Sequence, residues 1–168
     1  MAICMLLVLL HVRNSFMIKG LFETHINVTS LERSMKFYGE VLGLELGRYE
    51  EGRMVAFYWL GKWGEAMLGI WQKPKEQVLQ QHYAFRCEVN DILNLSVKYL
   101  KERNLRFQNF LNDGIERPMV FAWMPAISIY FNDPDNHSLE FIAMLPGKPQ
   151  PELGIISYEE WKAVDKSD

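Results

Sequence analysis

Two histidines and one glutamate stand in strand-like segments from which they could share a metal ion. His25 lies in the run 22–28, and His82 lies 57 residues later in the run 82–89. Each run precedes an amphipathic helical pattern, so one supersecondary unit occurs twice. Glu140 lies in the apolar stretch 139–143, where a carboxylate is costly to bury unless it is paired or ligated. A single strand histidine is more often structural, but equivalent strands place both histidines on corresponding faces.

This set of side chains suits a catalytic divalent ion. Two histidines and one carboxylate on separate strands can occupy one face of an octahedron and leave positions open for substrate or water. A divalent ion held in this way can polarise a bound oxygen or lower the pKa of a bound water. The donors suit Zn, Fe, Mn, Ni or Co, so His25, His82 and Glu140 predict a metal site without fixing the ion.

The periodicity of the chain predicts two βαβββ units, and therefore an α+β fold. Leu31, Met35, Tyr38 and Leu42 form a helical stripe behind the N-cap Ser30. The units span residues 18–72 and 82–145, joined by a polar linker. The expected helices cover 31–42 and, behind a cap at Asn90 or Asp91, the residues up to about 104. The expected strands cover 20–28, 44–49, 53–60 and 65–71 in the first unit, and 82–89, 105–110, 127–131 and 138–144 in the second.

Composition excludes several partner classes. The chain has 168 residues, 49% of them hydrophobic and 23% charged, with a net charge of −3, which is typical of one soluble globular domain. Without a basic run we expect no nucleic-acid or membrane partner. Cys4 and Cys87 lack metal-like spacing, so we expect reduced thiols and a cytoplasmic location. The stretch 3–10 is apolar but shorter than the ~20 residues of a membrane span. We interpret 1–16 as a doubtful extension before Met17.

The end of the chain predicts less regular structure. Residues 146–168 begin with a proline-rich tail, and the spacing of Ser157 and Glu160 predicts a capping box that starts a short helix. The turn 132–137 is dense in turn-forming residues, and we expect its His137 to be exposed to solvent.

The order of these motifs resembles the vicinal oxygen chelate superfamily, over about residues 18–145. Its opening is matched by His25-Ile26-Asn27-Val28 with Leu31-Glu32-Arg33-Ser34-Met35-Lys36-Phe37-Tyr38, and its closing hairpin by 130–141. That superfamily includes glyoxalase I, bleomycin-resistance proteins, fosfomycin-resistance thiol transferases and extradiol dioxygenases. The resemblance implies a curled, cup-shaped mixed sheet, often completed by a homodimer. It matches His25, His82 and Glu140 to the ligand positions, and it allows His25 to ligate the metal of the other subunit.

The chain departs from individual members of this superfamily. Glyoxalase I has a fourth ligand, a glutamate, at a position that Leu68 or Gly69 occupies here, and neither residue has a side chain that can ligate a metal. Ser128 and Tyr130 match a serine and a tyrosine of fosfomycin-resistance enzymes, but 119–124 is apolar where a phosphonate needs charged donors. We therefore expect an apolar or aromatic small-molecule substrate.

Three functional interpretations follow. The first is a metal-dependent lyase, isomerase, dioxygenase or thiol transferase that binds vicinal oxygens of a small substrate. In it Glu140 and Tyr130 are catalytic, and Ser128, Tyr83 and Trp123 bind substrate. The second is a metal-free protein that sequesters a small molecule, as the bleomycin-resistance relatives do. The third is a dimeric domain whose site has lost its function. The aromatic residues Trp59, Trp63, Trp71, Phe121 and Trp123 suit either a pocket or a core.

Overall fold

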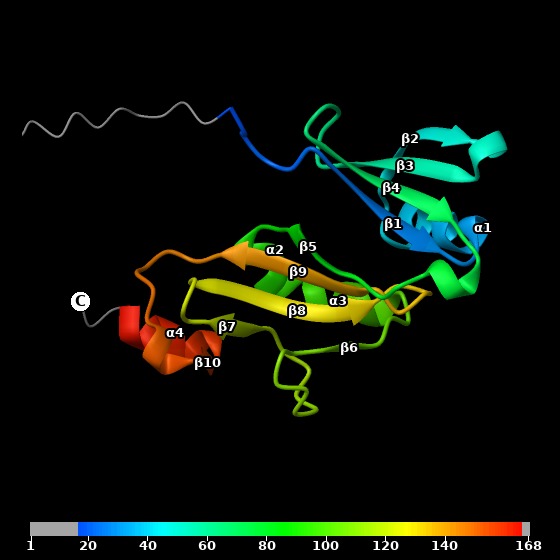
Figure 1. Ribbon diagram of the computed structural model, residues 1–168. Helices are drawn as coiled ribbons and strands as arrows, with labels where there is room; N and C mark the ends of the chain where they lie inside the picture. Colours follow the sequence, from blue (N-terminus) through cyan, green and yellow to red (C-terminus); the bar gives the residue numbers. More distant parts are fainter. Residues whose placement is uncertain (1–16, 166–168) are drawn as a thin grey trace, which may run out of the picture.

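The protein consists of a βαβββ unit and a second unit that repeats this order with additional short strands, each built on its own mixed sheet (Figure 1). This computed structural model describes residues 17–165, so the predictions made for 1–16 lie outside the described residues. The predicted α+β fold is confirmed. Among the described residues, no helix is long and apolar enough to cross a membrane.

The first unit forms a four-stranded sheet in the order β1-β4-β3-β2. Strand β1 pairs with β4 in parallel, and the other pairs are antiparallel. Its elements are β1 (Glu23–Val28), α1 (Leu31–Met35), η1 (Lys36–Val41), β2 (Glu45–Glu50), η2 (Glu51–Arg53), β3 (Val55–Leu60) and β4 (Ala66–Gln72), followed by η3 (Lys75–Gln77) in the linker.

The second unit forms a larger sheet in the order β10-β7-β8-β9-β5, with β6 also paired to β8. Strand β5 pairs with β9 in parallel. The elements are β5 (His82–Arg86), α2 (Val89–Asn94), α3 (Ser96–Glu102), β6 (Phe107–Gln108), β7 (Met119–Phe121), β8 (Ala126–Asn132), β9 (Ser138–Met144), η4 (Pro151–Leu153), β10 (Ile155–Ile156) and α4 (Tyr158–Asp165).

The two predicted long helices are each divided. The first begins at Leu31 behind the Ser30 cap and changes to π geometry from Lys36 to Val41. The second breaks at Leu95, beside Ser96, whose hydroxyl donates to the Ile92 carbonyl at 2.6 Å. Such back-bonding bends helices, and the helical spacing of apolar residues does not reveal it.

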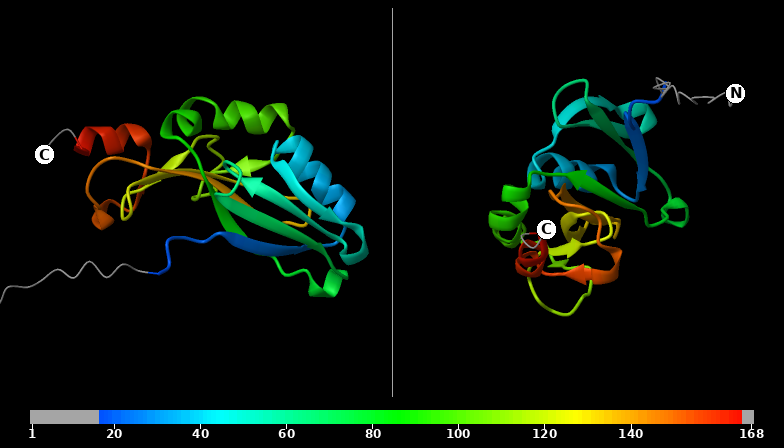
Figure 2. Two further views of the ribbon diagram at one scale, coloured as in Figure 1. Left: turned by 90° about the horizontal axis from the view of Figure 1, so that it is seen from above. Right: turned by 90° about the vertical axis from the view of Figure 1, so that its left-hand side faces the viewer.

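The main core lies between the units and draws on both. It contains Tyr38 and Tyr58 of the first unit and Leu100, Phe131 and Leu139 of the second. Figure 2 shows the helices of both units on one side of the molecule. There the Tyr99 hydroxyl of α3 donates to the Val41 carbonyl at the end of η1 (3.2 Å).

A buried polar joint also connects the units through the turn 133–137. The His137 side chain is 0% exposed, so the prediction that it is solvated is wrong. Its Nδ1 accepts from the Gln81 N–H (3.1 Å), and its Nε2–H donates to the Asn27 carbonyl (2.9 Å). The imidazole thus ties the end of β1 to the start of β5.

The same joint continues through two acidic side chains. Asp133 accepts from the Tyr38 hydroxyl at 2.9 Å, and Tyr38 also contacts the Tyr83 hydroxyl. Asp135 accepts from Arg33 at 2.7 Å and from Thr29 at 2.6 Å. These bonds cross from one unit to the other, so they set the angle between the two sheets.

A second core lies under the C-terminal helix. Trp161 of α4 is 2% exposed and packs with Ile92, Val120, Ile127 and other residues of the second unit. The capping box is present, because Ser157 and Glu160 exchange hydrogen bonds of 2.7–3.2 Å before α4 begins. Residues 155–156, which the sequence interpretation left without structure, form strand β10.

Candidate functional site

Two of the three predicted metal ligands meet on the second sheet. His82 begins β5, Glu140 lies on the neighbouring β9, and their Nε2 and Oε2 atoms are 3.3 Å apart. The parallel register pairs His82 with Ser138 and Ala84 with Glu140, so His82 and Glu140 stand on the same face. The repeat predicted a correspondence of His25 with His82, whereas the pairing of β5 with β9 brings His82 to Glu140.

The tautomer of His82 leaves its Nε2 atom without a proton. Its Nδ1–H donates to the Ser138 carbonyl at 3.1 Å, so Nε2 carries a lone pair in the neutral imidazole. A backbone acceptor at the second nitrogen is the usual way in which proteins orient a ligating histidine.

Glu140 has unmet bonding capacity. Its side chain is only 5% exposed, and its Oε1 is buried without a hydrogen-bond partner. Oε2 faces the lone pair of His82 Nε2, and a cation or a proton between the two atoms would satisfy both. The orphaned oxygen and the facing acceptors therefore fit a divalent cation.

Tyr130 lies beside this pair on β8. It pairs with Glu140 across the strands, and its ring centroid is 5.8 Å from that of His82. Burial and the Glu140 carboxylate raise the pKa of Tyr130, while the Ser128 hydroxyl opposes this by hydrogen bonding to it. Tyr130 is therefore a protonated phenol at neutral pH, and its hydroxyl lies within hydrogen-bonding reach of the Glu140 carboxylate.

His25 lies on the other sheet, in a different setting. Its Nδ1 accepts from the Trp71 indole N–H at 3.2 Å, its Nε2–H donates to Glu23, and its ring packs against Phe57. Its side chain is 44% exposed. This tautomer is opposite to that of His82.

Gly69 makes the position of His25 possible. It is the register partner of His25 on β4, and a Cβ at Gly69 would lie 2.5 Å from Cδ2 of the His25 ring. The absence of a side chain at this position therefore provides space for the imidazole.

One chain does not bring the predicted triad together. Within residues 17–165, no three histidine, cysteine or acidic side chains are close enough to hold an ion. His82 and Glu140 converge, and His25 stays on the first sheet.

The predicted substrate residues separate in the same way. Tyr83 follows His82 directly and so faces the opposite side of β5, where its hydroxyl contacts Tyr38 in the joint. Ser128 is 1% exposed, and its side chain hydrogen-bonds to that of Tyr130. Trp123 lines the pocket over Glu140.

That pocket has a volume of about 380 Å³ and a mostly apolar wall. Besides His82, Tyr130 and Glu140, it is lined by Phe110, Phe121, Trp123, Met124, Gly154 and Ile155. Sequence reasoning missed Phe110, Gly154 and Ile155. Nothing in the sequence near 110 or 154–155 pointed to the site.

Comparison with known proteins identifies the family. Residues 16–141 match the sequence profile of the Glyoxalase/Bleomycin resistance protein/Dioxygenase superfamily. The chain belongs to this superfamily. The match confirms the resemblance drawn from the opening and closing motifs.

Individual relatives of this superfamily differ in activity. The chain is 30% identical to the metallothiol transferase FosB of Staphylococcus epidermidis, over 74% of this chain and 83% of the relative. It is 25% identical to the lactoylglutathione lyase of Schizosaccharomyces pombe, over 87% of this chain but only 61% of that protein. An integron cassette protein from the Halifax Harbour sewage metagenome superposes with a TM-score of 0.64 at 37% identity, covering 76% of this chain and all of that one.

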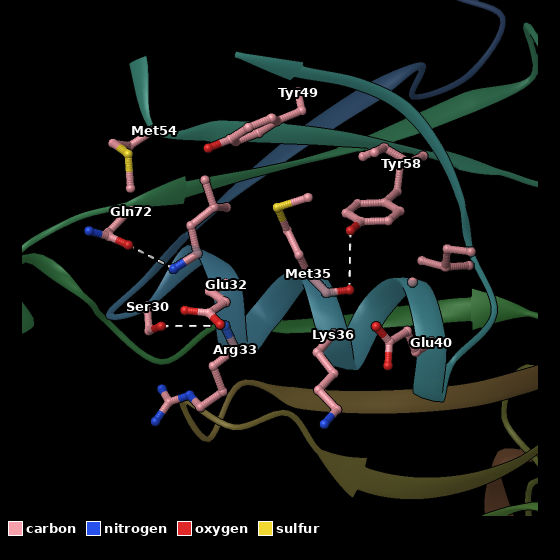
Figure 3. A pocket seen from close by; sticks show the side chains of 14 residues that line it. Ser30, Glu32, Arg33, Met35, Lys36, Glu40, Tyr49, Met54, Tyr58 and Gln72 are labelled. Atoms are coloured by element: carbon pink, nitrogen blue, oxygen red, sulfur yellow. Dashed lines mark hydrogen bonds between the residues drawn. The ribbon is translucent and has the colours of Figure 1, made fainter. Parts of the chain in front are cut away.

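A larger groove, of about 1040 Å³, lies away from these residues, between α1 and strands β2 and β3. Figure 3 shows Met35, Tyr49, Met54 and Tyr58 on its inner side, with Arg33 and Lys36 pointing away from them. The groove is lined by no histidine among the described residues and lies on the first unit, apart from the pocket that contains His82 and Glu140.

Proposed function

We propose that this protein is a metal-dependent enzyme of the glyoxalase superfamily that acts on a small substrate with two adjacent oxygens. The observation that carries the proposal is the buried, unpartnered Oε1 of Glu140 beside the lone pair of His82 Nε2. A divalent ion bound there would polarise the substrate oxygens and stabilise negative charge that develops on them. Metallothiol transferase among the relatives supports a metal in this family.

The residues of this chain have separable roles in that proposal. His82 and Glu140 hold the ion. Tyr130 keeps its proton at neutral pH and would donate a hydrogen bond from Oη to a substrate oxygen. Ser128 orients the Tyr130 hydroxyl. The reaction is a lyase, isomerase, dioxygenase or transferase reaction, and Gly69 leaves the first sheet without the additional carboxylate of glyoxalase I.

His25 would complete the site from a second copy of the chain. Strands β1 and β5 each have a single sheet partner, so each leaves one edge open among the described residues. His25 stands on β1 and His82 stands on β5. Edge-to-edge pairing of β1 with the partner's β5 in a twofold dimer would bring the two histidines together twice, once per site.

Metal analysis of mixed variants tests this arrangement. Purified without chelator, wild-type protein should hold about one divalent ion per chain, and His25→Ala and His82→Ala should each lose it. If the site is shared, mixing and re-annealing the two variants forms mixed dimers, each with one intact site. Random mixing should then restore about one quarter of the wild-type metal. Metal retained by both single variants would contradict the ligand assignment, and no recovery on mixing would contradict the shared site.

A metal-free binding protein is the second candidate. The tautomer of His25 favours it, because Trp71 and Glu23 already use both of its ring nitrogens. Ligation through Nε2 would require the ring to exchange these bonds. Ligand binding that is unchanged by chelator and by His25→Ala would support sequestration instead of catalysis.

A further inference from the structure

The C-terminal segment is built into the second sheet instead of trailing from it. The Gln150 N–H donates to the Ala122 carbonyl at 2.8 Å, and the Ala122 N–H donates to the Gly154 carbonyl at 3.0 Å. Strand β10 then pairs antiparallel with β7, placing Ile155 opposite Phe121. This segment follows the part of the chain that matches the superfamily profile, which ends at residue 141.

The helix that follows anchors this strand. Trp161 inserts into the second core at 2% exposure, and the Ser157–Glu160 capping box fixes the start of α4 directly after β10. Gly154, at a φ of 65°, makes the turn from η4 into the strand. The position of β10 is therefore determined from both ends.

The two residues of β10 face opposite sides. Ile156 packs with the second core, together with Trp161. Ile155 lines the pocket that also contains His82, Tyr130 and Glu140. The partner strand alternates in the same sense, since Val120 belongs to the second core and Phe121 lines the pocket.

We propose that Ile155 determines the size of the apolar group that this site accepts beside Glu140. The C-terminal segment, which follows the residues matched by the superfamily profile, then forms one wall of the pocket that selects the substrate group. The inference rests on the proposed function only for the identity of the pocket as the substrate site.

The wall also indicates the chemical class of the group. Among the described residues that line the pocket, none is lysine or arginine, so an anionic group would find no charged donor there. Aromatic rings form much of the surface, including Phe110 and Phe121 in edge-to-face contact at 5.1 Å. The expected occupant is an uncharged, planar or aromatic group.

Binding of an uncharged fluorescent probe, N-phenyl-1-naphthylamine, to the full chain tests the inference. Ile155→Trp fills the pocket and should weaken binding about tenfold. Ile155→Ala enlarges the pocket and should shift the preference toward a bulkier N-aryl analogue. Ile156→Ala is the matched control, because it shortens the neighbouring side chain on the opposite face. It should leave the affinity within about twofold. Circular dichroism establishes that each variant is folded.

Equal affinities for wild type and Ile155→Trp would overturn the inference, as would an Ile156→Ala effect as large as that at Ile155. Metal content, measured on the same samples, separates this inference from the proposed function. A wild-type chain that binds no metal but shows the Ile155 dependence contradicts the metal enzyme and leaves the wall intact. A chain that binds metal but lacks the Ile155 dependence contradicts the role of Ile155 and leaves the metal enzyme intact.

Discussion

Replacement of Glu140 by glutamine should stabilise the metal-free protein. The Glu140 side chain is 5% exposed, its Oε1 has no partner, and its Oε2 faces Nε2 of His82 at 3.3 Å. Because His82 donates through Nδ1 to Ser138, both facing atoms are acceptors in the neutral imidazole. The amide N–H of a glutamine can donate to His82 Nε2, and the variant buries no charge.

The magnitude follows from the cost of an unpaired buried polar group, about 1–3 kcal/mol. Glutamine recovers part of that cost, so we expect the free energy of unfolding without metal to rise by about 1 kcal/mol. In a chain of this length that corresponds to roughly 2–4 °C in Tm. A bound ion should instead stabilise the wild type more than the Glu140→Gln variant. At a hundredfold excess over its Kd, a metal that binds only the folded state adds about 2.7 kcal/mol to wild type, and the variant should lose most of this gain.

Thermal and urea unfolding, in chelator and in excess Mn²⁺ or Zn²⁺, measure both effects. Glu45→Gln is the control, because Glu45 is an exposed carboxylate on β2 and should change neither value. If Glu140→Gln is less stable than wild type in chelator, then the carboxylate has a partner in the fold and the reasoning is wrong. Equal stabilisation of wild type and variant by metal would separate Glu140 from the ion.

Three further outcomes are expected. Burial raises the pKa of Tyr38 and of Tyr83, and raises that of Tyr58 to about 12, so these phenols keep their protons when the unfolded chain loses them near pH 10. Stability should therefore fall as pH rises above about 10, by up to about 1.4 kcal/mol per unit per tyrosine, and Tyr38→Phe should flatten the fall in urea midpoints. Asp133→Ala removes the acceptor of three hydrogen bonds, which come from Tyr38 Oη–H and from the N–H groups of Asp135 and His137. The substitution should lower the free energy of unfolding by about 3 kcal/mol or more. Asp133→Asn should cost clearly less, and equal losses would refute the hydrogen-bond account. Gly69→Ala should displace the His25 ring and lower metal affinity about tenfold or more while leaving Tm nearly unchanged, as metal titration and melting will show.

The sequence was sufficient for the features that depend on local alternation and on the repeat. The repeated order of strands and helices and the strand carrying Glu140 follow from period-two patterning and equivalent positions. The repeat related His25 to His82, whereas in the structure His82 meets Glu140 through the pairing of β5 with β9. Tyr83 was placed in the pocket although it is the immediate neighbour of His82 on one strand. The same alternation, applied strictly, puts it on the opposite face, so this error was avoidable.

Other features depend on contacts that no local pattern encodes. His137 is buried because the end of β1, 110 residues earlier, packs against its turn, and turn-forming residues indicate the turn but not what covers it. Ile155 reaches the pocket through a strand of two residues, too short to show periodicity. Both cases are decided by tertiary packing, which overrides local propensity.

The joint at residues 133–137 also determines how His25 and His82 of one chain are placed relative to each other. His137 holds the Asn27 carbonyl and the Gln81 N–H, and these residues lie two positions after His25 and one before His82. The strands that carry the two histidines are thus fixed to each other at one end, although they belong to different sheets. His25 contacts Trp71 and lies opposite Gly69 on the first sheet. A change in this joint would alter the angle between the sheets without touching any ligand. If a second copy supplies His25, the buried polar bonds of the joint therefore control how closely it can approach the partner's ligand pair, and metal affinity should respond to Asp133 as well as to Glu140.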